Sequence, residues 1–374
     1  MKQVRCLYCG FFCSKYGKTR TGRQRWYCKE CHSVFVNPIN KRAHDFKHFI
    51  QWLFSKNVQR SMPGDGRDFR RKITKFWGIW PMPPKIESPM NVIYVDGIYL
   101  GRKACILICC NKRYVLGWYL CRYENSRAWE ALMQRIAAPA MVVSDGGHGF
   151  RKALKRVWPK AKLQRCTFHA FLQVKRYTTG RPKTIAGIEM YMIARDLLMI
   201  KDMEQAGHWV TRLINWRIKH KTFLSEMTQD EKGKLRPMHE CLLKAERSLV
   251  RLVRQNTLFT YLDESLSYGE ELPSTNNRIE GGINAQLRTM LRNHREMSIE
   301  RRIKAVFWWC YFYSPKPLSA SEILKVMPTD RSISKLYKAM NERAKLEDSI
   351  PTWGDAIVWS ELHKSDSFPA CFWD

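Results

Sequence analysis

Two aspartates stand where apolar runs of the chain end, in the pairs Asp96-Gly97 and Asp145-Gly146. They are conspicuous because residues 91–182 contain only four acidic residues. A carboxylate at the end of a buried strand is costly unless a cation meets it. If the two strands are neighbours, the aspartates converge, and a divalent metal between them would relieve their repulsion, as in two-metal phosphoryl transfer. The alternative is that each aspartate only forms a turn before its glycine.

A two-metal site normally uses a third carboxylate, and the best candidate lies in residues 274–288, STNNRIEGGINAQLR. This segment starts with N-cap residues and continues into a helix whose apolar stripe faces the core. Glu280 stands beside the stripe, and Asn284 and Arg288 follow on the same edge, which would face metal and DNA together. Glu189 comes earlier, but its surroundings are typical of a solvated helix face.

Cys166 and His169 form a C-x-x-H pair after the second aspartate. Two ligands cannot make a structural zinc site, and no neighbouring residue supplies two more. We expect a local role, either orienting the active-site helix or touching DNA near the scissile phosphate. The alternative is a buried cysteine beside a hydrogen-bonded histidine.

Five of the 13 cysteines fall in the first 31 residues, and four of them form two C-x-x-C pairs, Cys6 with Cys9 and Cys28 with Cys31. This spacing predicts a zinc ribbon, in which four thiolates close a tetrahedron and no position is left for catalysis. A pair of disulfides is the alternative, but the other cysteines are scattered as expected of reduced thiols. Cys13 is a spare neighbour that a four-ligand site does not need.

Two helical patterns follow in residues 41–80, and basic side chains cover the second beside its apolar stripe. They fit a helix-turn-helix-like reader of DNA, or alternatively a helical hairpin packed on the next domain. Residues 81–85 are expected to form a linker. The residues expected to contact DNA are Arg20, Arg23, Arg25, Arg67, Arg70, Arg71, Lys72, Lys75, Asn284 and Arg288.

The elements that must position the aspartates begin at residue 91, where three short apolar runs predict an antiparallel meander. Helices and short strands then alternate. The order β-β-β-α-β-α-β-α predicts an α/β layered domain. The expected strands are 92–95, 104–110, 114–120, 141–144 and 163–166, and the expected helices are 126–137, 150–158 and one from 168.

The 374 residues carry a net charge of +31, and 45% are hydrophobic, so the chain is long and apolar enough for two or three folded domains. Residues 1–90 carry +14, residues 91–182 carry +13 and residues 183–374 only +4. This distribution predicts nucleic acid along the N-terminal half. Without a long apolar run or an apolar signal core, we expect a soluble, cytoplasmic protein with no membrane partner.

Together these motifs resemble bacterial insertion-sequence DDE transposases of the Mutator-like superfamily. The resemblance is carried by Asp96, Asp145, the TNNRIEG segment with Glu280, and the C-x-x-H pair. It implies a ribonuclease-H-like catalytic core interrupted by an all-helical insertion, and the ribbon places the chain with a ribbon-bearing subgroup. The expected divisions are 1–40 zinc ribbon, 41–85 helix-turn-helix-like segment and linker, 86–180 first part of the core, 181–272 helical insertion, 273–314 last part of the core, and 315–374 a tail of unknown role.

The resemblance also implies a mechanism, in which Asp96, Asp145 and Glu280 hold two Mg²⁺ ions, with Mn²⁺ as an expected substitute, for strand cleavage and strand transfer at the ends of a mobile element. The implied partner is double-stranded DNA of the element ends and target, bound by a homodimer or higher oligomer in the bacterial cytoplasm, at the nucleoid when on DNA. The competing function is a ribbon and helix-turn-helix regulator without catalysis. A transposase class with a short aspartate-to-glutamate spacing is a further rival, for which only Glu189 is available.

Overall fold

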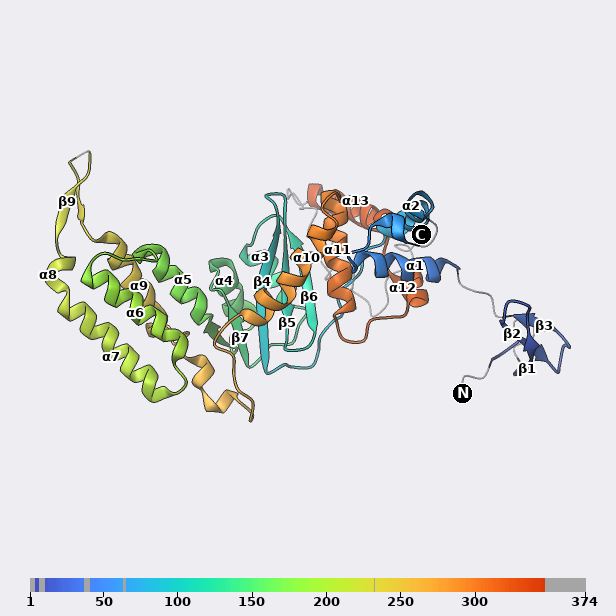
Figure 1. Ribbon diagram of the computed structural model, residues 1–374, viewed down its shortest axis with the longest axis horizontal. Coiled ribbons are helices and arrows are strands. Elements are labelled where there is room, and N and C mark those ends of the chain that lie inside the picture. The colour runs from blue at the N-terminus through green and yellow to red at the C-terminus, as the bar shows by residue number, and fades with distance from the viewer. Residues whose placement is uncertain (1–3, 7–10, 37–40, 63–64, 232, 347–374) are drawn as a thin grey trace.

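The computed structural model describes residues 4–6, 11–36, 41–62, 65–231 and 233–346. Figure 1 shows three parts along the longest axis, with a small N-terminal sheet at one end, a central sheet flanked by helices, and a helical extension at the other end. A mixed five-stranded sheet surrounded by many helices confirms the expected α/β class.

The central sheet has the strand order β6-β5-β4-β7-β8. Strands β4, β5 and β6 form an antiparallel meander, whereas β7 and β8 continue the sheet from β4 in parallel. The apolar runs that predicted these strands are the runs that become buried, and every residue of β5 is buried. Their bounds are β4 (Val92–Leu100), β5 (Ala104–Cys110), β6 (Val115–Cys121), β7 (Met141–Ser144) and β8 (Lys162–Arg165).

Strand β4 is longer than the predicted strand 92–95. Beyond Asp96 it keeps pairing with β5 as far as Leu100, and Ile98 and Leu100 are buried. The turn comes only at Gly101, whose φ of 65° suits glycine. Asp96 therefore lies inside a strand.

The two faces of the sheet bury different cores, as the two-residue period of a strand requires. Cys105 and Leu107 face the helices α3 and α4, whereas Ile106 and Ile108 face a larger core with α1, α2, α10 and α11. The helix bounds are α1 (Lys41–Leu53), α2 (Asp65–Thr74), α3 (Ser126–Met133), α4 (His148–Val157), α10 (Ala285–Asn293) and α11 (Ile299–Phe312).

Helices α1 and α2 pack into this larger core, which is the arrangement of the packed-hairpin alternative. The rings of Phe46 and Phe49 lie 5.1 and 6.5 Å from that of Trp308 on α11. Residues 81–83, expected to begin a linker, are buried, because Met82 belongs to the same core. Short 3₁₀ turns adjoin the pair at η1 (Gln59–Ser61) and η2 (Lys75–Gly78).

Part of the expected tail also belongs to this core. Helices α12 (Ala320–Val326) and α13 (Asp330–Leu346) contribute buried Ile323 and Leu336. The Nζ atom of Lys304, a residue only 1% exposed, lies 2.5 Å from a carboxylate oxygen of Asp330 and ties α13 to α11. Residues 347–374 of the expected tail lie outside the described residues.

The extension between α5 and the last part of the core buries a separate apolar cluster. Tryptophan side chains anchor it, and the Trp216 indole donates a hydrogen bond to the Ala186 carbonyl (2.9 Å). The helices are α5 (Thr167–Thr178), α6 (Ile185–Asp196), α7 (Met203–Lys219), α8 (Lys221–Leu224) and α9 (Glu240–Arg254), with 3₁₀ turns η3 (Leu197–Met199), η4 (Thr260–Leu262) and η5 (Glu264–Leu266).

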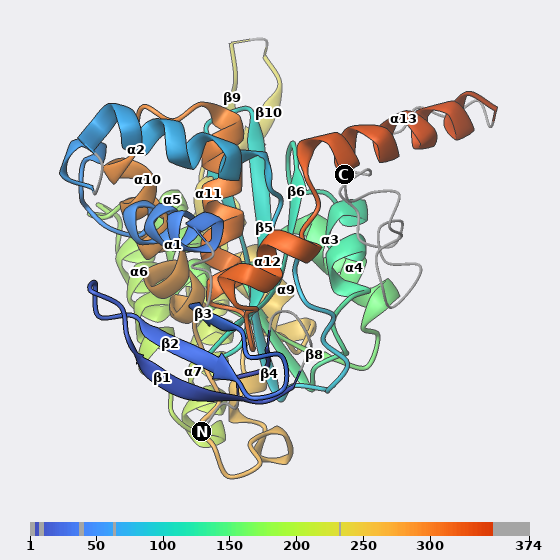
Figure 2. The ribbon, with the colours of Figure 1, turned by 90° about the vertical axis from the view of Figure 1, so that its right-hand side faces the viewer.

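The insertion was expected to be all-helical, but it also contains two strands. An antiparallel hairpin, β9 (Met227–Gln229) and β10 (Leu235–Pro237), interrupts it. Gly233, with φ of 74°, makes the turn that a helix could not accommodate. Figures 1 and 2 show the hairpin projecting beyond the neighbouring helices.

The N-terminal part is an antiparallel sheet of β1 (Cys13–Lys18), β2 (Gln24–Cys28) and β3 (Val34–Val36), and Figure 2 shows it in front of the central region. Among the residues described in this part, Cys6, Cys28 and Phe35 form its buried core. Among the helices that the structure describes, none has the length and apolar character needed to cross a membrane.

Candidate active site

The register of two parallel strands brings Asp96 and Asp145 together. Tyr94 of β4 lies opposite Val143 of β7, and each aspartate follows two residues later. Because β7 ends at Ser144, Asp145 emerges at the carboxyl edge of the sheet beside the part of β4 that has lost its β7 partner. Repulsion from Asp145 acts on Asp96, in agreement with this placement.

Glu280 comes from a π-helical turn, Arg278–Asn284, that leads into α10. Two asparagines fasten this turn to β4. The Asn276 side-chain amide donates a hydrogen bond to the Val95 carbonyl (3.0 Å), and the Asn284 amide donates one to Oδ2 of Asp96 (2.6 Å). The wider π-helical spacing, a frequent feature of functional sites, replaces the regular helix edge expected from the sequence.

The electrostatics of this cluster favour a bound cation. The pKa of Asp96 is raised to about 7, mainly by burial and also by repulsion from Asp145, Glu280 and Glu124, while a hydrogen bond from Gly97 N–H opposes the rise. Burial likewise raises the pKa of Glu280, and Asp145 adds repulsion. Carboxylates held together at this cost are stabilised in the charged form by a divalent metal.

Cys166 and His169 lie against Glu280. Nδ1 of His169 is 3.3 Å from Oε1 of Glu280 and also 3.3 Å from the Cys166 sulfur, which accepts a hydrogen bond from the Asn276 amide N–H (3.2 Å). One candidate ligand atom from each of Cys166, His169 and Glu280 lies within 4.8 Å of the others. The C-x-x-H pair therefore links the start of α5 to the glutamate turn.

Glu124 is a fourth carboxylate at the site that the sequence reasoning missed. It raises the pKa of Asp96, and its own pKa is raised by burial and by Asp145. The sequence did contain a signal that pointed to Glu124, because it is one of the four acidic residues in the basic stretch 91–182. Glu130, the remaining acid, instead pairs with Arg156 (2.8 Å) at the surface.

Glu189 lies away from these carboxylates, in the helical extension. Its carboxylate lies 2.5 Å from Nζ of Lys219 and 2.8 Å from Nε2 of His220, at the end of α7. These partners lower the pKa of Glu189, as expected for a structural ion pair.

The candidate DNA-contacting residues divide into three groups by their burial. Asn284 was expected to contact DNA, but it is fully buried and its side-chain amide holds Asp96. The π-helical turn directs this side chain into the site instead. Arg23 and Arg25 are half-buried on the N-terminal sheet. The exposed members are Arg20, Arg67, Arg70, Arg71, Lys72, Lys75 and Arg288.

The N-terminal sheet holds a second candidate metal centre. The sulfur atoms of Cys6, Cys28 and Cys31 lie within 4.8 Å of one another. Cys9 lies outside the described residues. Cys13 stands opposite Cys28 in the β1–β2 register. A cluster of thiolates at this spacing is compatible with zinc.

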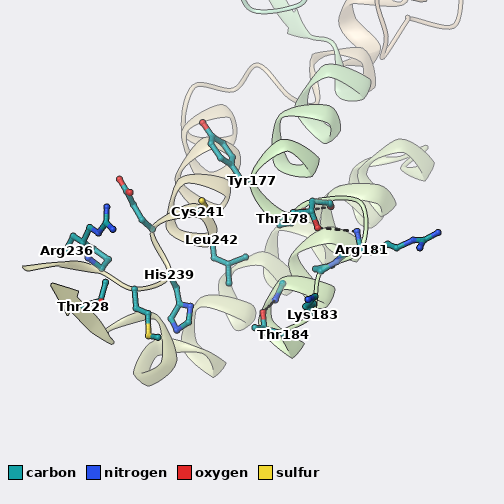
Figure 3. A pocket seen from close by; sticks show the side chains of 16 residues that line it. Tyr177, Thr178, Arg181, Lys183, Thr184, Thr228, Arg236, His239, Cys241 and Leu242 are labelled. Atoms are coloured by element: carbon teal, nitrogen blue, oxygen red, sulfur yellow. Dashed lines mark hydrogen bonds between the residues drawn. The ribbon is translucent and has the colours of Figure 1, made fainter. Parts of the chain in front are cut away.

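A pocket of about 460 Å³ lies elsewhere, in the helical extension. The turn between α5 and α6 and the start of α9 line it, and Figure 3 shows Arg181 extending away from Thr184 and His239. None of the four carboxylates lines this pocket.

Comparison with known proteins gives a family for part of the chain. Residues 105–230 match the family model described as "Transposase, Mutator family". The transposase for insertion sequence element IS905 of Lactococcus lactis subsp. lactis (strain IL1403) is 31% identical over 100 residues, which cover 22% of this chain and 26% of that protein.

A second relative is the transposase for insertion sequence element IS6120 of Mycolicibacterium smegmatis, 28% identical over 125 residues that cover 28% of this chain and 38% of that protein. The chain thus spans between about a quarter and two-fifths of the length of these relatives. The family match includes Glu124, Asp145, Cys166 and His169, whereas Asp96 and Glu280 lie outside it.

Proposed function

Since the chain is a Mutator-like relative of bacterial insertion-sequence transposases, we propose that it is itself a DNA transposase. It would bind the terminal inverted repeats of its element and catalyse metal-dependent strand cleavage and strand transfer. The observation that carries this proposal is the convergence of Asp96, Asp145 and Glu280 at one edge of the sheet.

The donor set fits Mg²⁺, which prefers carboxylate oxygens. The Oε1 atom of Glu280 is buried and accepts no hydrogen bond from the residues that the structure describes. Asp96, Asp145 and Glu280 would hold two ions, with Mn²⁺ as a substitute. When bound, such ions activate an attacking water or 3′-hydroxyl and stabilise the leaving oxygen.

The residues around the carboxylates would keep them in position. Asn284 and the Gly97 amide fix the two oxygens of Asp96, and His169 faces Glu280. Arg165 is half-buried beside Asp145, and a methyl group on Gly146 would lie 2.6 Å from its guanidinium carbon. Gly146 thus allows Arg165 to approach the loop that carries Asp145.

The same proposal assigns the larger parts. The central sheet and its helices would form a ribonuclease-H-like core, in which strand β4 carries Asp96 and the loop after β7 carries Asp145. Cys6, Cys9, Cys28 and Cys31 would hold a structural zinc ion in an N-terminal ribbon. Two or more subunits would act on paired element ends in the bacterial cytoplasm.

DNA contacts would come from the basic side chains of the N-terminal half. The net charges of +14 over residues 1–90 and +13 over residues 91–182 support a phosphate-rich partner. The exposed basic residues of α2 lie outside the apolar packing of that helix. They remain available to DNA although the helical pair is part of the core.

The test is a cleavage assay on DNA that carries the element's own terminal repeats. The native chain is expected to nick this DNA and to join its ends to a target with Mg²⁺, whereas Asp145→Ala is expected to bind but not cleave. If Asp145→Ala still cleaves this DNA, the assignment of Asp96, Asp145 and Glu280 as the catalytic carboxylates is wrong. Binding without cleavage by the native chain would favour the non-catalytic regulator.

A further inference from the structure

We propose that Glu124 is a fourth metal-ligating carboxylate, which holds an ion together with Asp145. This inference rests on the proposed function and adds a residue to the same site. Glu124 lies in the loop between β6 and α3, and the set of Asp96, Asp145 and Glu280 contains no residue from that loop.

Two glycines locate the Glu124 carboxylate. A methyl group on Gly97, the residue after Asp96, would lie 2.5 Å from Oε1 of Glu124. A methyl group on Gly147 would lie 3.8 Å from Oε2 of Glu124 and 3.6 Å from Oδ1 of Asp145. The Glu124 carboxylate therefore reaches from the β4 backbone beside Asp96 to the loop that carries Asp145. Oε2 of Glu124 and Oδ1 of Asp145 both lie within 4 Å of the position that a Cβ atom on Gly147 would occupy.

The backbone at Glu124 is held firmly against the Asp145 loop. Asn125 caps α3, since its side-chain oxygen accepts a hydrogen bond from the Ala128 amide N–H (2.9 Å). A methyl group on Gly149, in the first turn of α4, would lie 3.0 Å from the Asn125 carbonyl carbon. This close approach fixes the distance between the loops before α3 and before α4, and a preorganised ligand requires such support.

The surroundings of Glu124 differ from those of a structural ion pair. Within the described residues, Glu124 forms no ion pair with lysine or arginine, and only the neutral side chains of Tyr99 and Trp129 oppose the rise in its pKa. By contrast, Glu130 on α3 pairs with Arg156 and Glu189 pairs with Lys219. A half-buried carboxylate that faces other carboxylates without a cation is unfavourable. A divalent ion between Glu124 and Asp145 would supply the missing positive charge.

The experiment measures Mn²⁺ binding to the zinc-loaded full chain by titration calorimetry and compares Glu124→Gln with Glu130→Gln. The two substitutions remove the same charge from the same loop-helix unit. Glu124→Gln is expected to weaken one Mn²⁺ site at least about 10-fold and to raise the Mg²⁺ concentration needed for half-maximal cleavage by a similar factor. Glu130→Gln is expected to leave both values unchanged.

A third variant separates this inference from the proposed function. If Asp145→Ala loses Mn²⁺ binding and cleavage while Glu124→Gln keeps native values for both, the Glu124 assignment is overturned and the transposase site stands. If Asp145→Ala also keeps native Mn²⁺ binding, the site itself is misassigned. Glu124→Asp, which retains the charge on a shorter side chain, is expected to recover part of the lost Mn²⁺ affinity, whereas a merely structural glutamate would show no such recovery.

Discussion

The cysteine cluster and the carboxylate cluster are assembled in opposite ways. The cysteines all come from the first 31 residues, and the small buried cluster around them, as far as the structure describes this part, consists of Cys6, Cys28 and Phe35. The carboxylates come from positions 96 to 280 and stand between two large apolar cores. We therefore expect that metal bound at the first site would mainly hold the fold together, whereas metal bound at the second site would mainly supply chemistry.

The largest expected effect follows from Glu280→Gln. This change keeps the shape of the side chain but removes a metal-binding charge, so cleavage is expected to fall by about 10⁴-fold, the scale of losing one catalytic residue. DNA affinity should stay close to the native value, because Glu280 is assigned to the metal and not to DNA binding. Cleavage rates on terminal-repeat DNA check this, with the exposed Glu270→Gln as control. A fall of less than about 10-fold would place the metal chemistry elsewhere.

Cys28→Ser tests the other half of the comparison. Cys28 is fully buried in the N-terminal sheet, so its loss is expected to abolish zinc binding and to unfold that sheet. The central core should melt at its native temperature, because it does not depend on this cluster. Zinc content and calorimetric unfolding provide the measurement, and the exposed Cys241→Ser is the control. An unchanged zinc content would contradict the ribbon assignment.

Asp96→Asn, measured in magnesium-free buffer with zinc retained, is expected to increase the stability of the fold, which is a smaller effect of opposite sign. The pKa of Asp96 is about 7 in the folded chain and about 3.8 when exposed, so the folded state binds more protons between these values. Stability therefore falls as the pH rises from about 4 to about 7, and the full penalty is present at pH 8.

Asparagine removes that charge, and the free Oδ1 of Asn284 can accept a hydrogen bond from the new amide. Asp96→Asn should thus raise Tm at pH 8 by about 2–4 °C for each kcal/mol relieved, with little change near pH 4. Thermal melts at the two pH values measure this difference. A lower Tm at pH 8 would show that Asp96 is not under electrostatic strain.

The same contrast explains what the sequence could predict. The C-x-x-C spacing is local, so it pointed to Cys6, Cys28 and Cys31 without knowledge of the fold. The strand pattern indicated the sheet, and the apolar run before each aspartate indicated that Asp96 and Asp145 would converge if the two strands were neighbours. The β4–β7 register, which sets Asp96 level with Asp145, is information that no local sequence pattern contains.

Other features depended on tertiary packing and could not be derived in this way. Glu124 precedes a helix like many surface glutamates, and only the approach of α4 to Asn125 brings it to the site. Asn284 was placed on a DNA-facing edge because a regular helix was assumed, whereas the π-helical turn buries it. The packing of the 41–80 helices into the core required the aromatic contacts with α11.

The central claim, that Asp145 binds the catalytic metal, is tested most directly by Asp145→Cys. A thiolate is a poor ligand for Mg²⁺ and a better one for softer ions such as Mn²⁺. We therefore expect Asp145→Cys to lose terminal-repeat cleavage in Mg²⁺ and to regain part of it in Mn²⁺, while the native chain cleaves with both. Native-level cleavage by Asp145→Cys in Mg²⁺ would contradict the account.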